Sequence, residues 1–221
     1  MGDMMTRWFA MHVAHDDAPL PSGYTRLEYI TGSSAYINTG LPVRQGDRIV
    51  LKYYTGNTQG EQYIYGWRRS GTYSNPYQLA VNVNNGYRQI IAGKAISGAA
   101  IGTQAAFAFD QRNTLVIDTA ANRITVNGEI PSGLLYDLSN GAAFDDNGSS
   151  VYAPYLCAFD RIGSAIGTCT TTRLYLYTVT RNGADVMHLV PAINQNGVYG
   201  MYDAVSGNFF DSANSNEFTG A

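Results

Sequence analysis

Lysine is almost missing from this 221-residue chain, which contains only Lys52 and Lys94. Charged residues of all kinds make up 14% of it and the formal net charge is −3, whereas average soluble domains are ~25% charged. A protein that neutralises a phosphate backbone needs a basic stripe, and the sequence offers none. We therefore expect no nucleic-acid partner.

Glutamate is also scarce, and its four positions are scattered: Glu28, Glu61, Glu129 and Glu217. A retaining glycosidase needs two carboxyl groups about 5–5.5 Å apart, which on one strand face requires acidic residues at even spacing. Asp110 and Asp118 lie too far apart along the chain for this. His188 is the only histidine after residue 20, and no Gly-x-Ser-x-Gly elbow accompanies it. We therefore expect no enzymatic activity.

Long apolar runs and a recognisable signal peptide are absent too. No stretch approaches the ~20 apolar residues of a spanning helix, so we expect no membrane insertion. The first 17 residues hold only a short apolar piece interrupted by His12 and His15. We expect synthesis in a cytoplasm, which favours free thiols at Cys157 and Cys169 over a disulfide, although the two could pair.

The residues that are abundant favour β-structure. The chain has 17 Tyr, 24 Gly and 45% hydrophobic residues, and no helical period follows residue 20. Six Asn-Gly pairs punctuate it, and such pairs accept the positive φ angles of hairpin turns. The expected strands are 48–54, 62–67, 77–83, 87–91, 114–118, 123–127, 155–159, 171–179, 185–190, 198–202 and 207–210. We expect loops at 93–102 and 163–170. This spacing predicts an all-β sandwich or jelly roll.

The C-terminal end predicts a closing seam. Residues 198–202 and 207–210 form two expected strands, joined by a polar turn that Asp203 caps. A terminus rich in aromatic residues needs a strand to pair with, because a frayed end buries nothing. The entry segment 27–40 is similar in composition and is the expected partner. We therefore expect both ends of the chain to lie in one domain.

Residues 1–20 differ from the rest and form an N-terminal arm that precedes the expected domain at 21–221. Two prolines, Pro19 and Pro21, fix an extended path into the domain. Trp8, Phe9 and Met11 are too apolar to favour solvent and predict a docking segment. The alternative, that the arm is simply an unstructured tail, stays open.

Several segments resemble the concanavalin A-like (laminin-G-like) jelly-roll domains of phage and prophage virion proteins and gut bacterial surface proteins. They are the entry 20–30 with 34–40, the pair 173–177 and 188–192, and the closing pieces 200–203, 209–210 and 217–220. Asn38 stands where the family often has Asp. The resemblance implies a fold of two curved antiparallel sheets with adjacent termini. It implies little about function, because such sandwiches serve as lectins, adhesins, glycosidases and structural modules.

Two candidate sites follow from the residues within this fold. A sugar platform could form from one strand-loop-strand unit: Trp67, Arg68, Tyr73, Asn75 and Tyr77. Trp67 could equally be a core residue, as large aromatics usually are. A calcium site could form in a rim loop from Asp145, Asp146 and Asn147. The commoner use of such a loop is a solvated turn, and we expect no required cofactor.

The resulting hypothesis is a non-enzymatic virion surface protein that decorates a capsid or belongs to a tail or fibre. Its arm would bind other virion proteins, its domain could bind host or mucosal glycans, and it would be oligomeric or lattice-bound. The alternative is a free-standing lectin or adhesin of a gut bacterium, located outside the cell.

Overall fold

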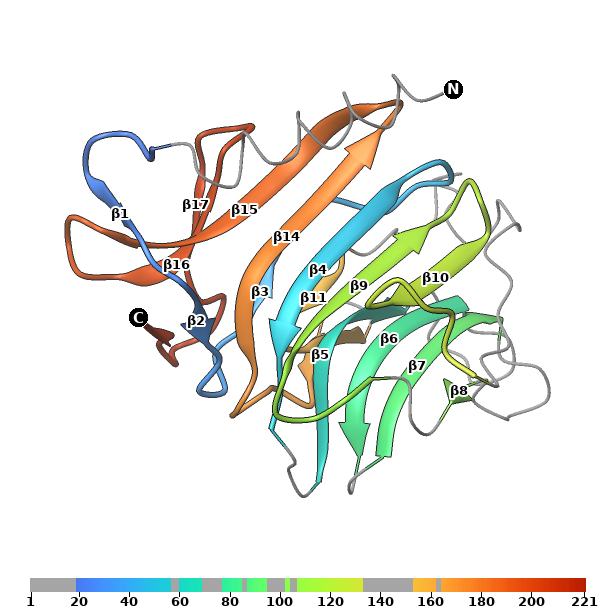
Figure 1. Ribbon diagram of the computed structural model, residues 1–221. Helices are drawn as coiled ribbons and strands as arrows, with labels where there is room; N and C mark the ends of the chain where they lie inside the picture. The colour runs from blue at the N-terminus through green and yellow to red at the C-terminus, as the bar shows by residue number, and fades with distance from the viewer. Residues whose placement is uncertain are drawn as a thin grey trace.

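The structure is a computed structural model that describes residues 19–56, 60–68, 77–84, 87–94, 102–103, 107–132, 153–161 and 164–221. Within these ranges the regular elements are all β-strands, which form two sheets (Figure 1). No helix in these ranges has the length and apolarity to cross a membrane.

The larger sheet, sheet A, contains both ends of the described chain. Its main path runs in the order β10 (Arg123–Val126), β9 (Arg112–Asp118), β4 (Arg48–Tyr54), β14 (Arg173–Arg181), β15 (Ala184–Asn194), β16 (Tyr199–Asp203) and β17 (Phe209–Phe210). Three short strands join it beside this path, namely β1 (Tyr24–Arg26), β2 (Ile30–Thr31) and β18 (Thr219–Gly220).

The second sheet, sheet B, forms the other layer. Its order is β13 (Ser164–Ile166), β12 (Phe159–Arg161), β5 (Glu61–Arg68), β6 (Tyr77–Asn84), β7 (Tyr87–Lys94) and β8 (Gly102–Thr103). Beside this path, β11 (Tyr155–Leu156) pairs with both β5 and β3 (Ile37–Asn38). The described strand pairs are antiparallel except β12 with β5, which is parallel.

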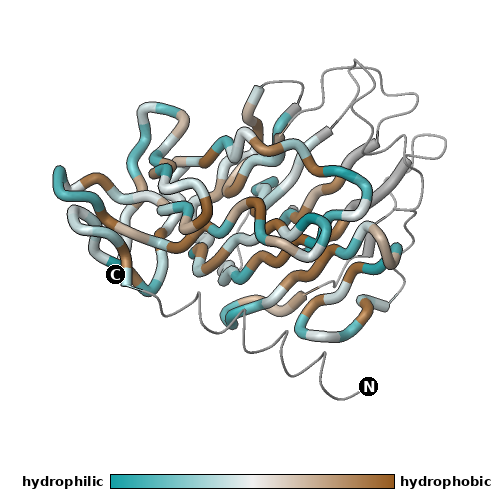
Figure 2. Tube along the Cα trace, turned by 90° about the horizontal axis from the view of Figure 1, so that it is seen from above, coloured by the Kyte–Doolittle hydropathy of each residue, from teal (hydrophilic) through white to brown (hydrophobic). Residues whose placement is uncertain are grey.

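The core lies between the sheets because side chains alternate along each strand. In β4, Ile49, Leu51 and Tyr53 are fully buried while their neighbours face outward. The facing strands of sheet B contribute residues such as Ile64 and Tyr65 to the same cluster. Figure 2 shows hydrophobic residues running through the middle of the molecule, with hydrophilic residues at turns along its margins.

A smaller apolar cluster lies on the opposite face of sheet A. Val190 and Ala192 alternate with the core residue Leu189 in β15, and they pack with Leu176 and Tyr202. Leu20, Tyr24 and Phe209 pack against this set from outside the main core. We call these seven residues the outer cluster. The described chain therefore enters the sandwich on the outer face of sheet A.

The structure confirms the all-β sandwich and the closing seam. Residues 199–203 and 209–210 form the antiparallel pair β16 and β17. Asp203 caps their turn, since its carboxylate accepts hydrogen bonds from the N–H groups of Val205 and Ser206 and from the Ser206 hydroxyl. The entry strand β2 pairs with the terminal strand β18, so the entry segment and the C-terminal end of the chain are neighbours.

Two sequence predictions were wrong in detail. Residues 155–159 are not one strand, because Cys157 adopts a φ of +63° that breaks the chain into β11 and β12. The segment 163–170 is not all loop, because 164–166 form β13 at the edge of sheet B. The loop predicted at 93–102 differs from the structure at its two ends, because β7 extends to Lys94 and β8 begins at Gly102.

Candidate functional site

Most residues of the sites expected from sequence lie outside the described ranges. These are the arm residues Trp8, Phe9 and Met11, the loop residues Tyr73 and Asn75, and the calcium candidates Asp145, Asp146 and Asn147. The backbones of Arg68 and Tyr77 end β5 and begin β6, which pair as neighbours. Among the described residues, no group of three or more His, Cys, Asp or Glu side chains could hold a metal ion.

Trp67 lies in the core. Its side chain is 4% exposed, and its ring meets that of Tyr65 edge-on at 6.0 Å between centroids. Both residues point inward because they are two positions apart on β5. The indole is therefore enclosed by protein, as the core interpretation of this residue expects, and it offers no open face to a sugar.

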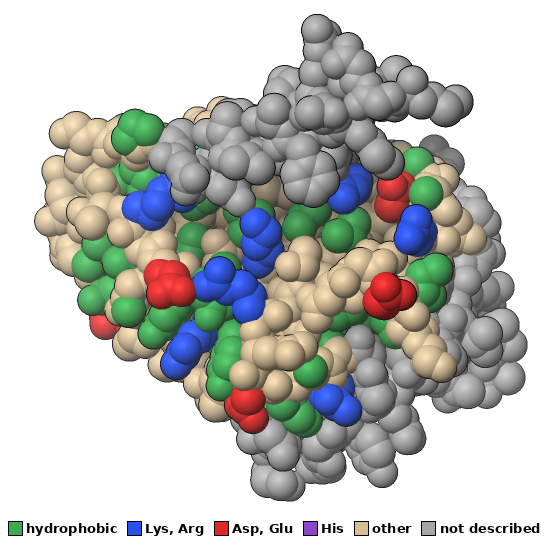
Figure 3. All heavy atoms as spheres, viewed as in Figure 1, with side chains coloured by type: hydrophobic (Ala, Val, Ile, Leu, Met, Phe, Trp, Pro, Cys, Tyr) green, Lys and Arg blue, Asp and Glu red, His purple; other side chains and the backbone are tan. Residues whose placement is uncertain are grey.

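Aromatic rings on the outer face of sheet A are covered by arginines. The guanidinium of Arg173 lies 4.6 Å from the ring centre of Tyr29 and 5.0 Å from that of Tyr54. Arg112 lies 3.8 Å from the ring centre of Tyr175. Figure 3 shows Lys and Arg side chains spread over this face, with hydrophobic side chains between them. These contacts are cation–π pairs within the chain, so these rings already have partners.

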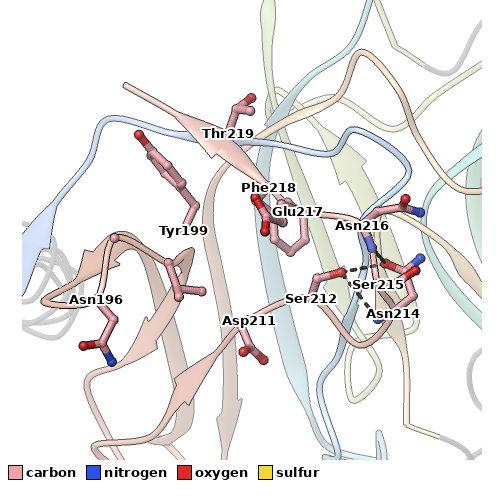
Figure 4. A pocket seen from close by; sticks show the side chains of 12 residues that line it. Asn196, Tyr199, Asp211, Ser212, Asn214, Ser215, Asn216, Glu217, Phe218 and Thr219 are labelled. Atoms are coloured by element: carbon pink, nitrogen blue, oxygen red, sulfur yellow. Dashed lines mark hydrogen bonds between the residues drawn. The ribbon is translucent and has the colours of Figure 1, made fainter.

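A pocket of about 480 Å³ opens beside the closing seam (Figure 4). Two segments form it, and we call it the seam pocket. Its lining residues are Asn196, Gly197, Val198, Tyr199, Asp211, Ser212, Asn214, Ser215, Asn216, Glu217, Phe218 and Thr219. The volume is within the ~300–1,000 Å³ range of small-molecule sites.

The first wall is the turn between β15 and β16. The Asn194 side-chain oxygen accepts hydrogen bonds from the N–H groups of Asn196 at 2.9 Å and Val198 at 3.1 Å. Gly197 supplies the positive φ of +78° that this turn requires. The Asn196 amide and the Val198 side chain, 39% exposed, are thereby held at the pocket rim.

The second wall is the loop between β17 and β18, and an asparagine network fixes its shape. The Asn214 side-chain oxygen accepts from the Ser212 hydroxyl at 2.8 Å and from the N–H of Asn216 at 3.0 Å. The amide nitrogens of Asn214 and Asn216 both donate to the carbonyl of Ser34, at 2.9 and 3.2 Å. The loop is therefore tied to the entry segment, 180 residues away in sequence.

Tyr199 and Phe218 provide the apolar surface of the pocket. Phe218 is buried in the main core, while Tyr199 is half-buried and packs against that core. The Tyr199 ring also abuts Gly220, where an added Cβ would lie 3.1 Å from it. Tyr199 is therefore held in place from behind while it lines the pocket.

Carboxylates, amides and hydroxyls supply the polar groups of the pocket. Asp211 and Glu217 are both exposed side chains, and the twelve lining residues include no Lys or Arg. Such a site favours a neutral or cationic ligand over an anionic one. Aromatic side chains beside several hydrogen-bonding side chains are a typical arrangement for binding a sugar, which has one apolar face and many hydroxyls.

Sequence reasoning placed these residues in a structural seam and missed the pocket. The segment 211–216 is rich in Ser and Asn, and a polar stretch of this kind between two strands is the signal that could have drawn attention to it. The part of the chain that faces residues 211–216 is set by strand pairing, including that of β18 with β2. Comparison with protein-family models and with curated proteins gave no match.

Proposed function

We propose that this chain is a non-enzymatic virion surface protein that binds neutral glycans in the seam pocket. The observation that carries the glycan part is the lining of that pocket, in which Tyr199 lies among amides and carboxylates with no cationic side chain. Sugar hydroxyls donate to carboxylates and exchange hydrogen bonds with amides, while the apolar sugar face contacts the ring.

The exposure of the two carboxylates supports binding rather than cleavage. In a glycosidase, one carboxylic acid is kept protonated by apolar surroundings so that it can donate to the leaving oxygen. Asp211 and Glu217 are exposed. They suit acceptance of hydrogen bonds from a bound sugar, and we expect bound glycans to stay intact.

The virion part rests on the resemblance to laminin-G-like jelly-roll domains of virion proteins and on the character of the arm. Residues 1–18 include the apolar side chains of Trp8, Phe9 and Met11, and the chain that follows them is anchored by Leu20 in the outer cluster. An arm of this composition suits docking on another virion protein. The same pocket would serve a free-standing lectin, the alternative function.

A glycan array probed with the intact protein, with and without calcium, tests the binding. We expect hits among neutral glycans, and at least tenfold weaker binding by Asp211→Asn and Glu217→Gln. Glu129→Gln is the matched control, because Glu129 is exposed and is not among the residues that line the pocket. No hits from folded protein, or equal binding by the pocket variants, would refute the proposal.

Removal of residues 1–18 tests the attachment and spares Leu20. We expect the shortened chain to fold, with the same melting temperature within a few degrees, and to be lost from purified particles. Normal incorporation of the shortened chain would show that the arm is not the anchor. A full-length protein that is absent from particles would favour the lectin alternative.

A further inference from the structure

The two cysteines lie next to each other where the chain crosses from sheet B to sheet A. Cys157 separates β11 from β12, and Cys169 lies between β13 and β14. The N–H of Cys169 donates to the carbonyl oxygen of Cys157 at 3.0 Å. Residues joined by such a bond have Cα atoms about 5 Å apart, which is within the range that a disulfide spans.

The two thiols are also in contact. The hydrogen bond between them, together with burial, raises the pKa of the Cys157 thiol well above its ordinary value. Cys169 Sγ lies 2.7 Å from the carbonyl oxygen of Tyr63 on β5. Both cysteines are fully buried, and a Cβ added at Gly32 would lie 3.0 Å from Cys157 Sγ. Both cysteines therefore lie in one buried region beside Gly32, whose added Cβ would also lie 3.3 Å from the Cys169 carbonyl oxygen.

We propose that Cys157 and Cys169 are a modification site that forms an intramolecular disulfide when the folded protein meets a peroxide-class oxidant. One thiolate attacks the peroxide, its sulfur becomes a sulfenic acid and the first water leaves. The second thiol then displaces the hydroxyl from that sulfur, and the second water leaves. Both S–H bonds are lost, one S–S bond forms, and the peroxide takes up two electrons.

The disulfide closes the loop that contains β12 and β13. Those short strands form one edge of sheet B, and Cys169 leads into β14 in the middle of sheet A. The disulfide would therefore link the edge of sheet B to the segment that connects sheet B to β14 of sheet A. Closing a loop of about 13 residues limits the unfolded chain, and we expect the melting temperature to rise by about 5–10 °C.

The reaction should be slow in the native state. The thiolate is the species that reacts, the pKa of the Cys157 thiol is raised, and the burial of both sulfurs shields them from the oxidant. Oxidation therefore requires local opening, which mild heating accelerates. The pair therefore differs from reactive catalytic cysteines, which are exposed and ionised.

The test treats the reduced, full-length protein with hydrogen peroxide under native conditions and then blocks free thiols before denaturation. We expect a monomer whose intact mass is lower by two hydrogen atoms, with no thiol left to alkylate and a raised melting temperature. A reductant should restore both thiols and the original melting temperature.

Single replacements Cys157→Ser and Cys169→Ser serve as controls, because neither can form the bond. We expect peroxide to raise the melting temperature of neither variant. Two thiols that survive in the oxidised wild type, a mass gain of oxygen atoms alone, or disulfide-linked dimers would each overturn the proposal. The wild-type measurement decides the question even if a variant fails to fold.

Discussion

Tyrosine has two separate roles among the residues of this sandwich. On the outer face of sheet A, Tyr29, Tyr54 and Tyr175 lie under the guanidinium groups of arginines. Inside, Tyr53, Tyr65 and Tyr177 are fully buried with their hydroxyls. The number of tyrosines indicated β-structure in the sequence, but composition alone does not say which rings point inward. That depends on strand register.

Tyr53→Phe should stabilise the protein. The Tyr53 hydroxyl is buried without a hydrogen-bond partner in the structure, and an unsatisfied buried hydroxyl costs about 1 kcal/mol or more. We expect the free energy of unfolding, measured with urea, to rise by about 1 kcal/mol. Tyr177→Phe is the control, because it removes a contact of 3.5 Å with the Tyr65 hydroxyl and should destabilise. A loss of stability in both variants would contradict this account.

Asp47 and Arg181 form a bidentate ion pair in which the carboxylate is fully buried. The two Asp47 oxygens accept from Nε and Nη2 of Arg181 at 2.7 and 2.8 Å, and the Asp47 side chain is 0% exposed. We expect Asp47→Asn to lower the free energy of unfolding by about 3 kcal/mol, because Arg181 loses its buried partner. The sequence gives no sign of this pair, since its members are 134 positions apart.

An exposed ion pair provides the matched comparison for Asp47. Arg112 and Glu28 lie 2.8 Å apart with side chains that are 51% and 66% exposed. We expect Glu28→Gln to change stability by less than about 1 kcal/mol. Equal effects of Asp47→Asn and Glu28→Gln in the same urea titration would mean that burial does not strengthen the inner pair.

Whole strands were the features that the sequence predicted best. The hairpins β6–β7, β9–β10 and β14–β15 form where Asn-Gly pairs or short turns separate alternating runs. Asn182 and Gly183 adopt the positive φ angles that such a turn needs. Strand β13 and the break at Cys157 were missed, because both depend on contacts with β5 and β12 and not on local propensity.

Gly200→Ala should detach β17 from β16. A Cβ at this position would collide with the carbonyl oxygen of Phe210 and lie 2.8 Å from the Phe209 ring. We expect the free energy of unfolding to fall by about 3 kcal/mol and glycan binding to be lost, because Asp211 follows β17 directly.

Gly207→Ala is the control for Gly200→Ala. Gly207 also lies in the seam, with a φ of +78°, and the atom nearest to an added Cβ is the Tyr202 hydroxyl at 3.6 Å. Its replacement should cost only about 1 kcal/mol of backbone strain. Equal losses of stability from the two alanines would show that close strand approach is not what Gly200 provides.

At the scale of the whole molecule, the sequence predicted two sheets with adjacent chain ends but not the seam pocket. The seam pocket needs the turn at 195–198, the loop at 211–218 and the anchor at Ser34 to come together. Only the pairing of β18 with β2 and of β16 with β15 achieves this. The pairing of β18 with β2 joins segments far apart in the sequence and leaves no local pattern, so the sequence did not indicate this pocket.

Alkaline pH should destabilise the whole sandwich. Burial raises the pKa of Tyr53, Tyr65 and Tyr177 above the ordinary value of 10. The contribution of these three tyrosines to the free energy of unfolding is therefore fully present below about pH 10, where the unfolded chain also keeps its phenol protons. It is lost as the pH rises above that value. We expect the free energy of unfolding to fall by up to about 4 kcal/mol per pH unit there.

The check is a urea titration at several pH values around 10, with tyrosinate absorbance followed in parallel. Tyr53→Phe should show a fall that is shallower by about 1.4 kcal/mol per pH unit, since one buried phenol is gone. Ionisation of all tyrosines near pH 10 in the folded protein would contradict the burial of these three rings.

The most direct test of the proposed function is where a sugar binds. A crystal structure of the full chain, soaked with a neutral oligosaccharide that it binds on the array, would locate the ligand. We predict a sugar ring in the seam pocket, in contact with Tyr199 and hydrogen-bonded to Asp211 or Glu217. An empty seam pocket with the sugar bound at another surface would contradict the account.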